Sequence, residues 1–501
     1  MSSRWNVISI GLCGLALFAT FAVLSILNSG GYRYGASDQA FYVPAVLRQM
    51  DPTLFPRDRK LLAVQDHLLI LDNLLAEVAI LTRTSVVQVM FVAYWVMLLA
   101  VAVAGWVFGR ALLDTHWGAA ALVIAMSIRH RVPKTGVNTL EHYFHPRMLA
   151  FAAGTAALGA LLRRRTWVAL ALVVLAGIIH PTTGIWFAIV VGVGAVVADS
   201  RHRRVLLVIG LTGVTMAALL LVIAGPLRHG IVVMDREWLT VLDKKDYLFP
   251  TEWSLATWAQ HSLYIVVIAL TIRARQRAGA WRPGETALIS GLAAMLVLMI
   301  ASLPFIHARV ALAVQLQITR AMWLFDLLAV AYAVWWVVEA PRPHGAVVRG
   351  RRWAVALIAV LSLIRGTYVM YVERAGHPLL QVELEPDEWR DATRWIGRQP
   401  SDVHVLADPA HARRFGSSVR VAAARDVYLE DVKDAAIAMY SRDMAMRVLG
   451  RTRALGDFST LTPERALELA RTYDLDYLVA ERAIDLPLAY KNARFRVYHL
   501  R

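Results

Sequence analysis

Long apolar runs separated by short polar segments fill the first three quarters of the chain. A helix needs about 20 apolar residues to cross a bilayer, and Trp5–Leu27 approaches that length. No small-residue cleavage motif closes this run, so we expect a retained first helix and not a signal peptide. The pattern predicts a polytopic α-helical membrane protein with about eleven transmembrane helices. The ten further runs are Val86–Phe108, His116–Ile128, Met148–Leu162, Trp167–Ile179, Thr182–Ala198, Val205–Ala224, Ala256–Ile272, Glu285–Ser302, Arg320–Val338 and Trp353–Tyr371.

The composition agrees with a protein that is mostly solvated by lipid. The 501 residues are 58% hydrophobic, which exceeds the usage of soluble domains, roughly 45–50%. The net charge of +16 could suggest nucleic acid, but the arginines form short tracts between apolar runs. Retention of positive loops in the cytoplasm explains such tracts, so we expect no nucleic-acid partner. The single cysteine, Cys13, excludes an intramolecular disulfide.

Four basic tracts on alternate loops predict the orientation of the helices. If these tracts are cytoplasmic, the N-terminus is cytoplasmic and everything after Tyr371 lies outside. One segment departs from the rule, because four basic residues lie where alternation predicts the outside. They are Arg129, Arg131, Lys134 and Arg147, and we expect them to have a function. The four tracts are residues 163–165, 201–204, 273–277 and 349–352.

Two parts of the predicted outside are large. The first loop, residues 28–85, carries Asp38 directly after the first helix, and Leu61–Leu81 has apolar residues at helical spacing with polar interruptions. This pattern is typical of helices lying in the membrane interface. The transmembrane domain, including this loop, is therefore predicted to be 1–374, followed by an extracytoplasmic α/β domain, 375–501. The patterns that predict this α/β domain are strands at Val403–Ala407 and Tyr477–Ala480, a helix at Pro463–Tyr473 and a period-two alternation of side chains at 495–500.

Histidine, arginine and carboxylate gather on the predicted outer face. The His180-Pro181 step divides an apolar stretch too long for one span, so we expect a turn there. The other outer polar residues are Glu141, His142, His145 and Arg147, the segment His229 to Glu252, and His307 with Arg309.

The layout resembles the C-class membrane glycosyltransferases, which transfer sugar from a polyprenyl-phosphate carrier on the outer membrane face. The points of contact are Ser37-Asp38-Gln39-Ala40-Phe41-Tyr42 after the first helix, the long loop, the number of spans and the external C-terminal domain. The run Gln317–Trp323 and the ending Asp476–Val479 with Phe495–Tyr498 look like bacterial members of uncharacterised subfamilies. Many members have two acidic residues in the first loop, whereas here Asp38 is followed by Gln39.

This resemblance implies a role for each polar group. Asp38 would accept the proton of the acceptor hydroxyl in an inverting transfer, and Leu68, Leu71 and Leu75 would guide the prenyl chain. A divalent metal is possible, and its ligands are unknown. The basic groups that would stabilise the departing phosphate are Arg320, Arg309, His307, Arg129, Arg131, Lys134 and Arg147. The groups that would contact acceptor or donor are His142, His145, His180 and Glu141.

Each of these residues also has a structural interpretation. Asp38 can cap the helix that follows it, and Arg320 can extend to the headgroups. The histidines can pack or cap turns. Their Glu-His-x-x-His spacing invites a metal, but the order in zinc proteases is H-E-x-x-H.

Three functions compete at this stage. The first is a glycosyltransferase of the bacterial cytoplasmic membrane, using a polyprenyl-phosphate sugar to modify an envelope glycan, glycolipid or protein. The second is a secondary transporter or lipid-linked oligosaccharide flippase, which predicts similar halves and ionisable residues inside spans; Asp326 is a single such residue. The third is a non-catalytic subunit of an envelope assembly complex, which would tolerate Asp38→Asn.

Overall fold

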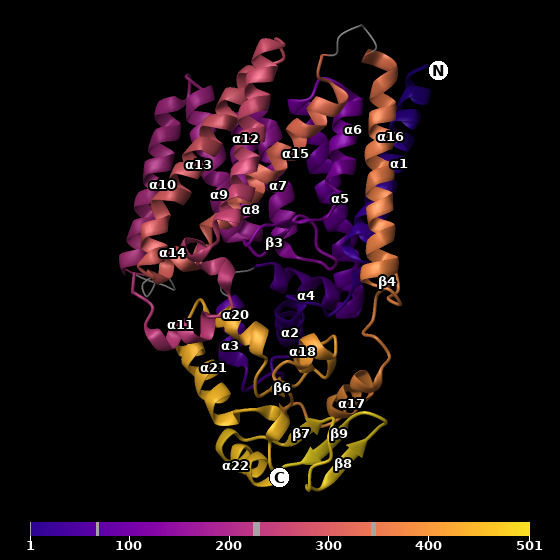
Figure 1. Cartoon of the computed structure of the whole chain (residues 1–501), viewed down its shortest axis with the longest axis vertical. Helices are drawn as coiled ribbons and strands as arrows, with labels where there is room; N and C mark the ends of the chain where they lie inside the picture. The colour runs from indigo at the N-terminus through magenta and orange to yellow at the C-terminus, as the bar shows by residue number, and fades with distance from the viewer. Residues whose placement is uncertain (1, 67–69, 224–230, 342–346) are drawn as a thin grey trace. The chain divides into compact units, whose positions relative to one another are not determined.

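The computed structural model describes residues 2–66, 70–223, 231–341 and 347–501 (Figure 1). His67, Leu68 and His229 lie outside the described residues. The chain forms two compact units. Unit 1 comprises Met1–Tyr32, Tyr94–Val233 and Asp246–Leu379, and unit 2 comprises Arg33–Ala93, Met234–Lys245 and Leu380–Arg501. Most of the predicted first external loop therefore groups with the C-terminal segment by contacts, while the predicted boundary at 374/375 stays a prediction.

Unit 1 is a bundle of long apolar helices, and the predicted membrane protein is confirmed. In the described part of the chain, seven helices are long and apolar enough to cross a membrane, and three apolar helices are shorter. Each predicted run overlaps a helix, and the count of eleven spans stays a prediction. The helices are α1 (Ser2–Ser29), α5 (Val86–Leu112), α6 (His116–Ala125), α7 (Pro146–Leu162), α8 (Thr166–Ile179), α9 (Pro181–Ala198), α10 (Arg203–Ile223), α12 (Leu255–Arg277), α13 (Pro283–His307), α14 (Ala311–Gln315), α15 (Met322–Val338) and α16 (Val347–Tyr368).

Short elements connect these helices. A two-stranded antiparallel hairpin joins α6 to α7, and a 3₁₀ turn leads into α15. The minor elements of unit 1 are β2 (Arg131–Val132), β3 (Val137–Asn138), η1 (Asp246–Leu248), η2 (Pro250–Glu252), η3 (Ile318–Ala321) and the π-helical turn η4 (Val369–Glu373). Strands β1 (Tyr32–Arg33) and β4 (Leu380–Gln381) lie at the points where the chain passes from one unit to the other.

Loops that carry basic residues meet at one end of unit 1. Arg164 Nη2 donates to the Ala198 carbonyl at 3.3 Å, joining the α7–α8 loop to the end of α9. Arg275 is fully buried and binds Glu285 through two hydrogen bonds of 2.9 and 2.8 Å. Because a buried charge needs a partner of opposite sign, this pair fixes α12 against α13. Hydrogen bonds and an ion pair thus connect neighbouring helices and loops at the basic end of the bundle.

Unit 2 contains a five-stranded mixed sheet in the order β6-β5-β7-β9-β8. The first three strands are parallel and the last two pairs are antiparallel. Apolar residues of alternating strand positions pack on Trp389, Ala392 and Ile396 of α17 (Glu388–Gly397) to form the core. The strands are β5 (His404–Leu406), β6 (Asp426–Val427), β7 (Tyr477–Ala480), β8 (Leu488–Lys491) and β9 (Arg496–His499). The small C-terminal α/β region is confirmed.

Helices from all three chain segments of unit 2 accompany this sheet. The predicted helix at Pro463–Tyr473 is α22, with Thr462 as its N-cap. The others are α2 (Gln39–Met50), α3 (Arg59–Asp66), α4 (Leu71–Thr82), α11 (Arg236–Leu242), α18 (His411–Arg414), α19 (Val419–Ala422), α20 (Asp431–Ala438), α21 (Arg442–Leu455) and η5 (Phe458–Thr460).

Helix α4 exposes an apolar stripe that differs from the predicted one. Leu75, predicted to face the prenyl chain, is buried, and α4 packs on α2. The exposed stripe is instead formed by Ile70, Leu74, Val78 and Leu81, at helical spacing. The helix is amphipathic, as predicted, whereas the exposure predicted for Leu75 is wrong because this side chain is buried.

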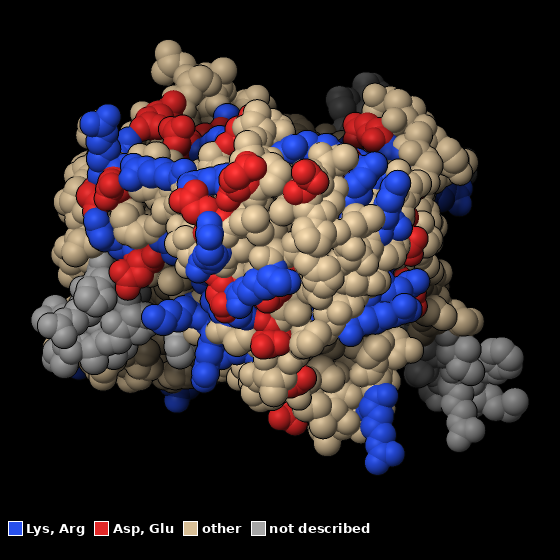
Figure 2. All heavy atoms as spheres, turned by 90° about the horizontal axis from the view of Figure 1, so that it is seen from below, with Lys and Arg blue, Asp and Glu red and all other residues tan. Residues whose placement is uncertain are grey.

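The surface of unit 2 mixes charges of both signs. Figure 2 shows a face on which Lys and Arg side chains lie among Asp and Glu side chains. Exposed ion pairs make the same point, and they include Arg414 with Glu481 and Arg442 with Asp235. Such interspersed charge is typical of a solvated protein surface.

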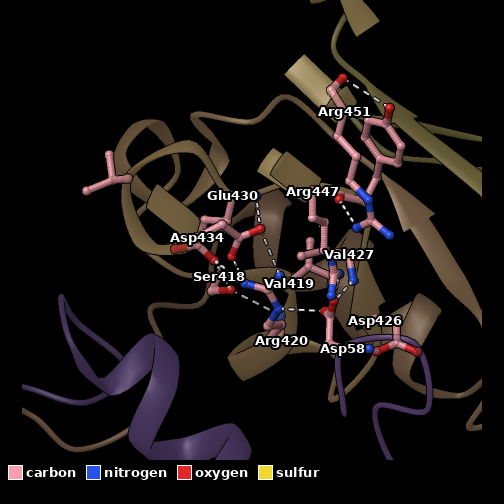
Figure 3. A network of polar contacts seen from close by, with 12 residues as sticks. Asp58, Ser418, Val419, Arg420, Asp426, Val427, Glu430, Asp434, Arg447 and Arg451 are labelled. Carbon is pink, nitrogen blue, oxygen red and sulfur yellow. Dashed lines mark hydrogen bonds and ion pairs between the residues drawn. The ribbon is translucent and has the colours of Figure 1, made fainter. Parts of the chain in front are cut away.

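A buried network of charges joins the first loop to the C-terminal segment inside unit 2 (Figure 3). Asp58 accepts a 2.7 Å hydrogen bond from Arg420 Nε and a second bond from Arg447. Arg420 in turn donates to both carboxylate oxygens of Asp434, at 2.7 and 3.2 Å. Asp58, Arg420 and Asp434 are all buried. Because these charges compensate one another, breaking one partner leaves an uncompensated buried charge.

Two more acids of this network have raised pKa values. Burial, opposed by Arg420 and reinforced by the charge of Asp434, raises the pKa of Glu430 to about 7. Burial and the charge of Asp58 raise the pKa of Asp426 to about 6. Asp426 accepts hydrogen bonds from the backbone N–H groups of Arg57 and Asp58, at 2.9 and 3.0 Å. The first loop is therefore fixed to the sheet through both its side chains and its backbone.

We expect Asp58→Asn to destabilise unit 2 by about 3–5 kcal/mol, because Arg420 and Arg447 lose their shared carboxylate while they stay buried or half-buried. Pulse proteolysis of the full-length protein in detergent measures the free energy of unfolding. Asp474→Asn is the matched control, since Asp474 is an exposed partner of Arg57 and Arg501. Equal stability of the Asp58 variant and the control would contradict this expectation.

Glu430→Gln tests the raised pKa. A carboxyl whose pKa rises on folding stabilises the fold below its ordinary pKa, and this contribution is lost as the pH rises through about 7. The variant should therefore match wild type at pH 5 and exceed its stability by about 1–3 kcal/mol at pH 8. The same proteolysis assay at both pH values checks this. A difference that does not change with pH would show that Glu430 is ionised throughout.

Candidate functional site

Arg320 is positioned by the β2–β3 hairpin of unit 1. Its Nε donates to the Thr135 carbonyl at 3.2 Å, and its guanidinium carbon lies 5.2 Å from the centre of the Tyr247 ring. Gly136 has a φ of +69°, and a Cβ added there would lie 3.4 Å from Arg320 Nη2. A glycine therefore suits the left-handed turn, and Tyr247 Cγ would lie 3.3 Å from such a Cβ. The position of the Arg320 guanidinium is thus fixed by the Thr135 carbonyl and the Tyr247 ring.

His145 and His180 occupy equivalent positions, each followed by proline at the start of a helix. His145 caps α7, and its Nδ1 accepts a 3.2 Å hydrogen bond from the Arg147 N–H. His180 caps α9, and its Nδ1 accepts from the Thr183 N–H at 3.4 Å. Since a backbone N–H can only donate, Nδ1 is unprotonated in each neutral ring and the proton lies on Nε2. Both imidazoles are thus fixed with Nε2 as a hydrogen-bond donor.

The two rings lie close together, with centroids 6.4 Å apart. Burial, followed by the charges of His145, Arg147 and Arg320, lowers the pKa of His180 well below its usual value. His180 therefore stays neutral at physiological pH in a positively charged environment. The N-termini of α7 and α9 add partial positive charge at the same place. This end of unit 1 is suited to an anion.

Glu141 and Arg147 form a buried ion pair within this cluster. Arg147 Nη2 donates to Glu141 Oε1 at 2.9 Å, and both side chains are at most 5% exposed. Asn138 Nδ2 donates to both Glu141 oxygens, at 3.2 and 3.1 Å. Glu141 thus orients Arg147, a role that fits the structural interpretation of this carboxylate. Arg147, Arg320, His145 and His180 are called the cationic cluster below.

An apolar cleft of about 330 Å³ begins beside the cationic cluster. Thr182, two residues after His180, and Ile318, two residues before Arg320, both line it. Its exposed lining residues include Ile185 and Phe305. The remaining lining residues are Trp186, Ile189, Leu298, Ala301, Ser302 and Leu316, from α9, α13 and the segment between α14 and η3. A cationic end and an apolar cleft together suit an amphiphile with an anionic head.

The other predicted basic residues of unit 1 have partners that the sequence does not reveal. Arg309 pairs with Glu252 and lies 4.3 Å from the centre of the Phe249 ring. Lys134 pairs with Asp246, and Arg129 Nε donates to the Leu140 carbonyl at 2.9 Å.

Three further predicted residues of unit 1 lie in different settings. Arg131 is exposed on β2, and His307 is exposed in the last turn of α13. His142 packs edge-on against Tyr143.

Asp38 lies at the N-cap position of α2, in unit 2. Its backbone carbonyl accepts from the N–H groups of Phe41 and Tyr42, but its side chain makes no capping hydrogen bond. Oδ1 instead accepts a 2.6 Å hydrogen bond from Lys433 Nζ. The neighbouring Gln39 is buried, and its side-chain oxygen accepts from the Gly35 N–H at 2.7 Å. The side chain of Asp38 is therefore not used for capping.

Lys433 and Lys245 are not among the residues that the sequence predicts. Lys245 Nζ donates to the Val432 carbonyl at 2.8 Å. Burial and the nearby ammonium of Lys433, opposed by Asp38 and Asp431, lower the pKa of Lys245 to about 8. A lysine with a lowered pKa beside a candidate base indicates a functional environment. No local pattern identifies these lysines, because their partners lie in distant parts of the sequence.

Asp326, the candidate for a transporter, is satisfied inside unit 1. Its Oδ1 lies 2.8 Å from His130 Nε2. Burial alone would lower the pKa of His130, but the hydrogen bond to Asp326 and its negative charge raise it. Asp326 also lines a cavity of about 30 Å³, close to the size of one water molecule. Asp326 thus has the features of a paired structural carboxylate.

The histidines and acids do not assemble into a metal site in the described part of the chain, where no three His, Cys, Asp or Glu side chains could hold an ion.

Comparison with solved structures gives distant similarities. The chain is similar to the archaeal oligosaccharyltransferase AglB from Archaeoglobus fulgidus in complex with an inhibitory peptide and a dolichol-phosphate, at 12% identity and a TM-score of 0.46, covering 93% of this chain and 69% of that chain. The apo form of the Archaeoglobus fulgidus oligosaccharyltransferase matches at 12% identity with a TM-score of 0.44 over the same shares. Its complex with zinc and sulfate matches at 13% identity with a TM-score of 0.44, over 93% and 68%.

No protein-family model matches the chain, and no curated protein matches it.

We expect Arg320→Gln to weaken binding of geranylgeranyl phosphate by about 10-fold or more, because a charged hydrogen-bond donor to the phosphate is lost. Titration of the lipid into purified protein in nanodiscs, followed by tryptophan fluorescence, measures this. Arg273→Gln is the control, since Arg273 is exposed and lies near the C-terminal end of α12. Equal affinity of both variants and wild type would remove Arg320 from the anion site.

Proposed function

We propose that the protein is a glycosyltransferase that moves a sugar from a polyprenyl-phosphate donor to an envelope glycan, glycolipid or protein acceptor. The observation that carries this proposal is the cationic cluster beside the apolar cleft of unit 1. A polyprenyl phosphate has the matching two parts, an anionic head and an apolar tail. The cluster would bind the phosphate, and the cleft would bind the first isoprene units.

The cluster also suits the chemistry of the transfer. As the bond between sugar and phosphate breaks, negative charge grows on the phosphate oxygens. Arg147 and Arg320 are held by Glu141 and Thr135, so they need little rearrangement to meet that charge. The Nε2–H groups of His145 and His180 would add neutral donors. Preorganised donors of this kind stabilise a transition state more than mobile ones do.

Asp38 is our proposed base. In an inverting transfer the acceptor oxygen attacks the anomeric carbon, the acceptor proton passes to a carboxylate, and the carrier phosphate leaves. The Asp38 side chain is one-third exposed and engages an ammonium instead of the helix terminus, which supports a chemical role. We further propose that the reaction takes place on the outer face of the cytoplasmic membrane, as the basic tracts predict. The proposed roles of this chain are thus a phosphate site, formed by the cationic cluster, and a base. Adding or chelating divalent metal in the carrier-release assay tests whether the reaction also needs a metal.

Asp38→Asn decides this proposal. Wild-type protein in nanodiscs, given a panel of polyprenyl-phosphate pentoses and hexoses with candidate acceptors, should release free polyprenyl phosphate detectable by mass spectrometry. The variant should be slower by about 100-fold or more, because general-base catalysis contributes on that order. Asp51→Asn, an exposed aspartate at the other end of α2, is the control and should keep full activity.

The other outcomes favour the competing functions. Equal release by wild type and Asp38→Asn would leave the glycosyltransferase in place and remove Asp38 as base. Absence of release with every donor, with and without divalent metal, would favour the transporter or the accessory subunit. Uptake of lipid-linked sugar into proteoliposomes without carrier release would identify the transporter.

A further inference from the structure

The side chain of Asp38 is engaged by a lysine from a distant part of unit 2. Lys433 Nζ lies 2.6 Å from Asp38 Oδ1, and the two residues are 395 positions apart in the chain. The Lys433 side chain is 13% exposed and that of Asp38 is 34% exposed. The same ammonium lies 3.4 Å from Ser37 Oγ and 5.8 Å from the centre of the Phe41 ring. Lys433 thus contacts three residues around the start of α2.

The helix that carries Lys433 is fixed near both ends. Asp434, the next residue of α20, is the bidentate partner of buried Arg420. Near the C-terminal end of α20, the Ala438 carbonyl accepts a 2.8 Å hydrogen bond from the indole N–H of Trp238. Since α20 is held by a buried charge network and by a buried tryptophan, Lys433 is presented from a rigid support. A rigidly presented ammonium can fix the carboxylate that it binds.

We propose that Lys433 is the positioning residue for Asp38, setting the direction of its carboxylate and keeping that carboxylate ionised until it accepts the acceptor proton. This inference rests on the proposed function of Asp38 as base. An ammonium within hydrogen-bond distance of a carboxylate stabilises the charged form, so the base is available at lower pH. Fixing one oxygen also restricts the orientations that the carboxylate can adopt. The C-terminal segment of unit 2 therefore supplies a residue that acts through Asp38.

A second lysine, Lys245, lies near the pair formed by Lys433 and Asp38. Lys245, held at the Val432 carbonyl, is coupled electrostatically to Lys433, Asp38 and Asp431. Lys245 is thus a second cation near the pair, whose own hydrogen bond goes to the backbone. Removal of Lys433 leaves Lys245 in place, so any effect on Asp38 reports the loss of the direct 2.6 Å contact.

The test compares Lys433→Gln with wild type in the carrier-release assay across pH 5–9. We expect kcat to fall by about 10-fold or more with KM changed less than about twofold, because the lysine acts on the base and not on substrate affinity. The acid limb of the pH–rate profile should move up by about one pH unit. Lys433→Arg, which restores a cation, should recover most of the rate and the wild-type acid limb.

Two further variants guard the interpretation. Lys433→Met keeps the aliphatic stem over Phe41 and is judged by the same readouts if Lys433→Gln does not fold. Lys244→Gln is the control, because Lys244 is exposed and lies next to Lys245 in sequence. A folded Lys433→Gln or Lys433→Met variant with wild-type kcat and an unmoved acid limb would overturn the inference.

The proposed function can fail separately from this inference. If wild type releases no carrier, both fall together. If wild type is active and Asp38→Asn is not, while the Lys433 variants behave as wild type, the function stands and only the role of Lys433 is lost. If Asp38→Asn is as active as wild type, Lys433 has no base to position and the inference is rejected.

Discussion

The hydrogen bonds that His145 and His180 accept at the starts of α7 and α9 are the constraint on which the site of unit 1 depends. In both places the next residue is proline, whose fixed φ and missing N–H suit the first position of a helix. The imidazole then satisfies one of the free N–H groups of the first turn. One contact therefore ends a loop, caps a helix and fixes a tautomer. The capping interpretation of these histidines and their chemical role are compatible, because capping uses Nδ1 and leaves Nε2 as a donor.

Partners of the charged groups explain how the cationic cluster is tolerated beside apolar helices. A charge near lipid is costly unless a partner or a polar surface compensates for it. Arg147 has Glu141, and Arg320 has a backbone carbonyl and the face of Tyr247. The N-termini of α7 and α9 add partial positive charge at the same place. An anionic lipid head would complete this compensation, and the adjoining cleft would accept the tail that such a head carries.

Local patterns in the sequence predict elements much better than they predict partners. β7 and α22 occupy the predicted residues, because alternation and helical spacing are properties of a few neighbouring positions. Arg309 and Arg320 look alike in sequence, yet one is paired with Glu252 and the other lies at the hairpin. On α4 the period is predicted correctly, whereas Asp72 is buried and the exposed face runs through Leu74. Which face is buried depends on the packing of α2, and that information is not local.

The contact between Asp38 and Lys433 follows from a constraint located twenty residues further along the first loop. Asp58 is buried against Arg420, and Arg420 is shared with Asp434 of α20. Because the three charges must stay together to be stable in the interior, α3 and α20 cannot separate without leaving a charge unpaired. Lys433 is the residue adjacent to Asp434, so the network that stabilises unit 2 also determines where the lysine can reach. A buried ion cluster thereby determines which residues surround the proposed base.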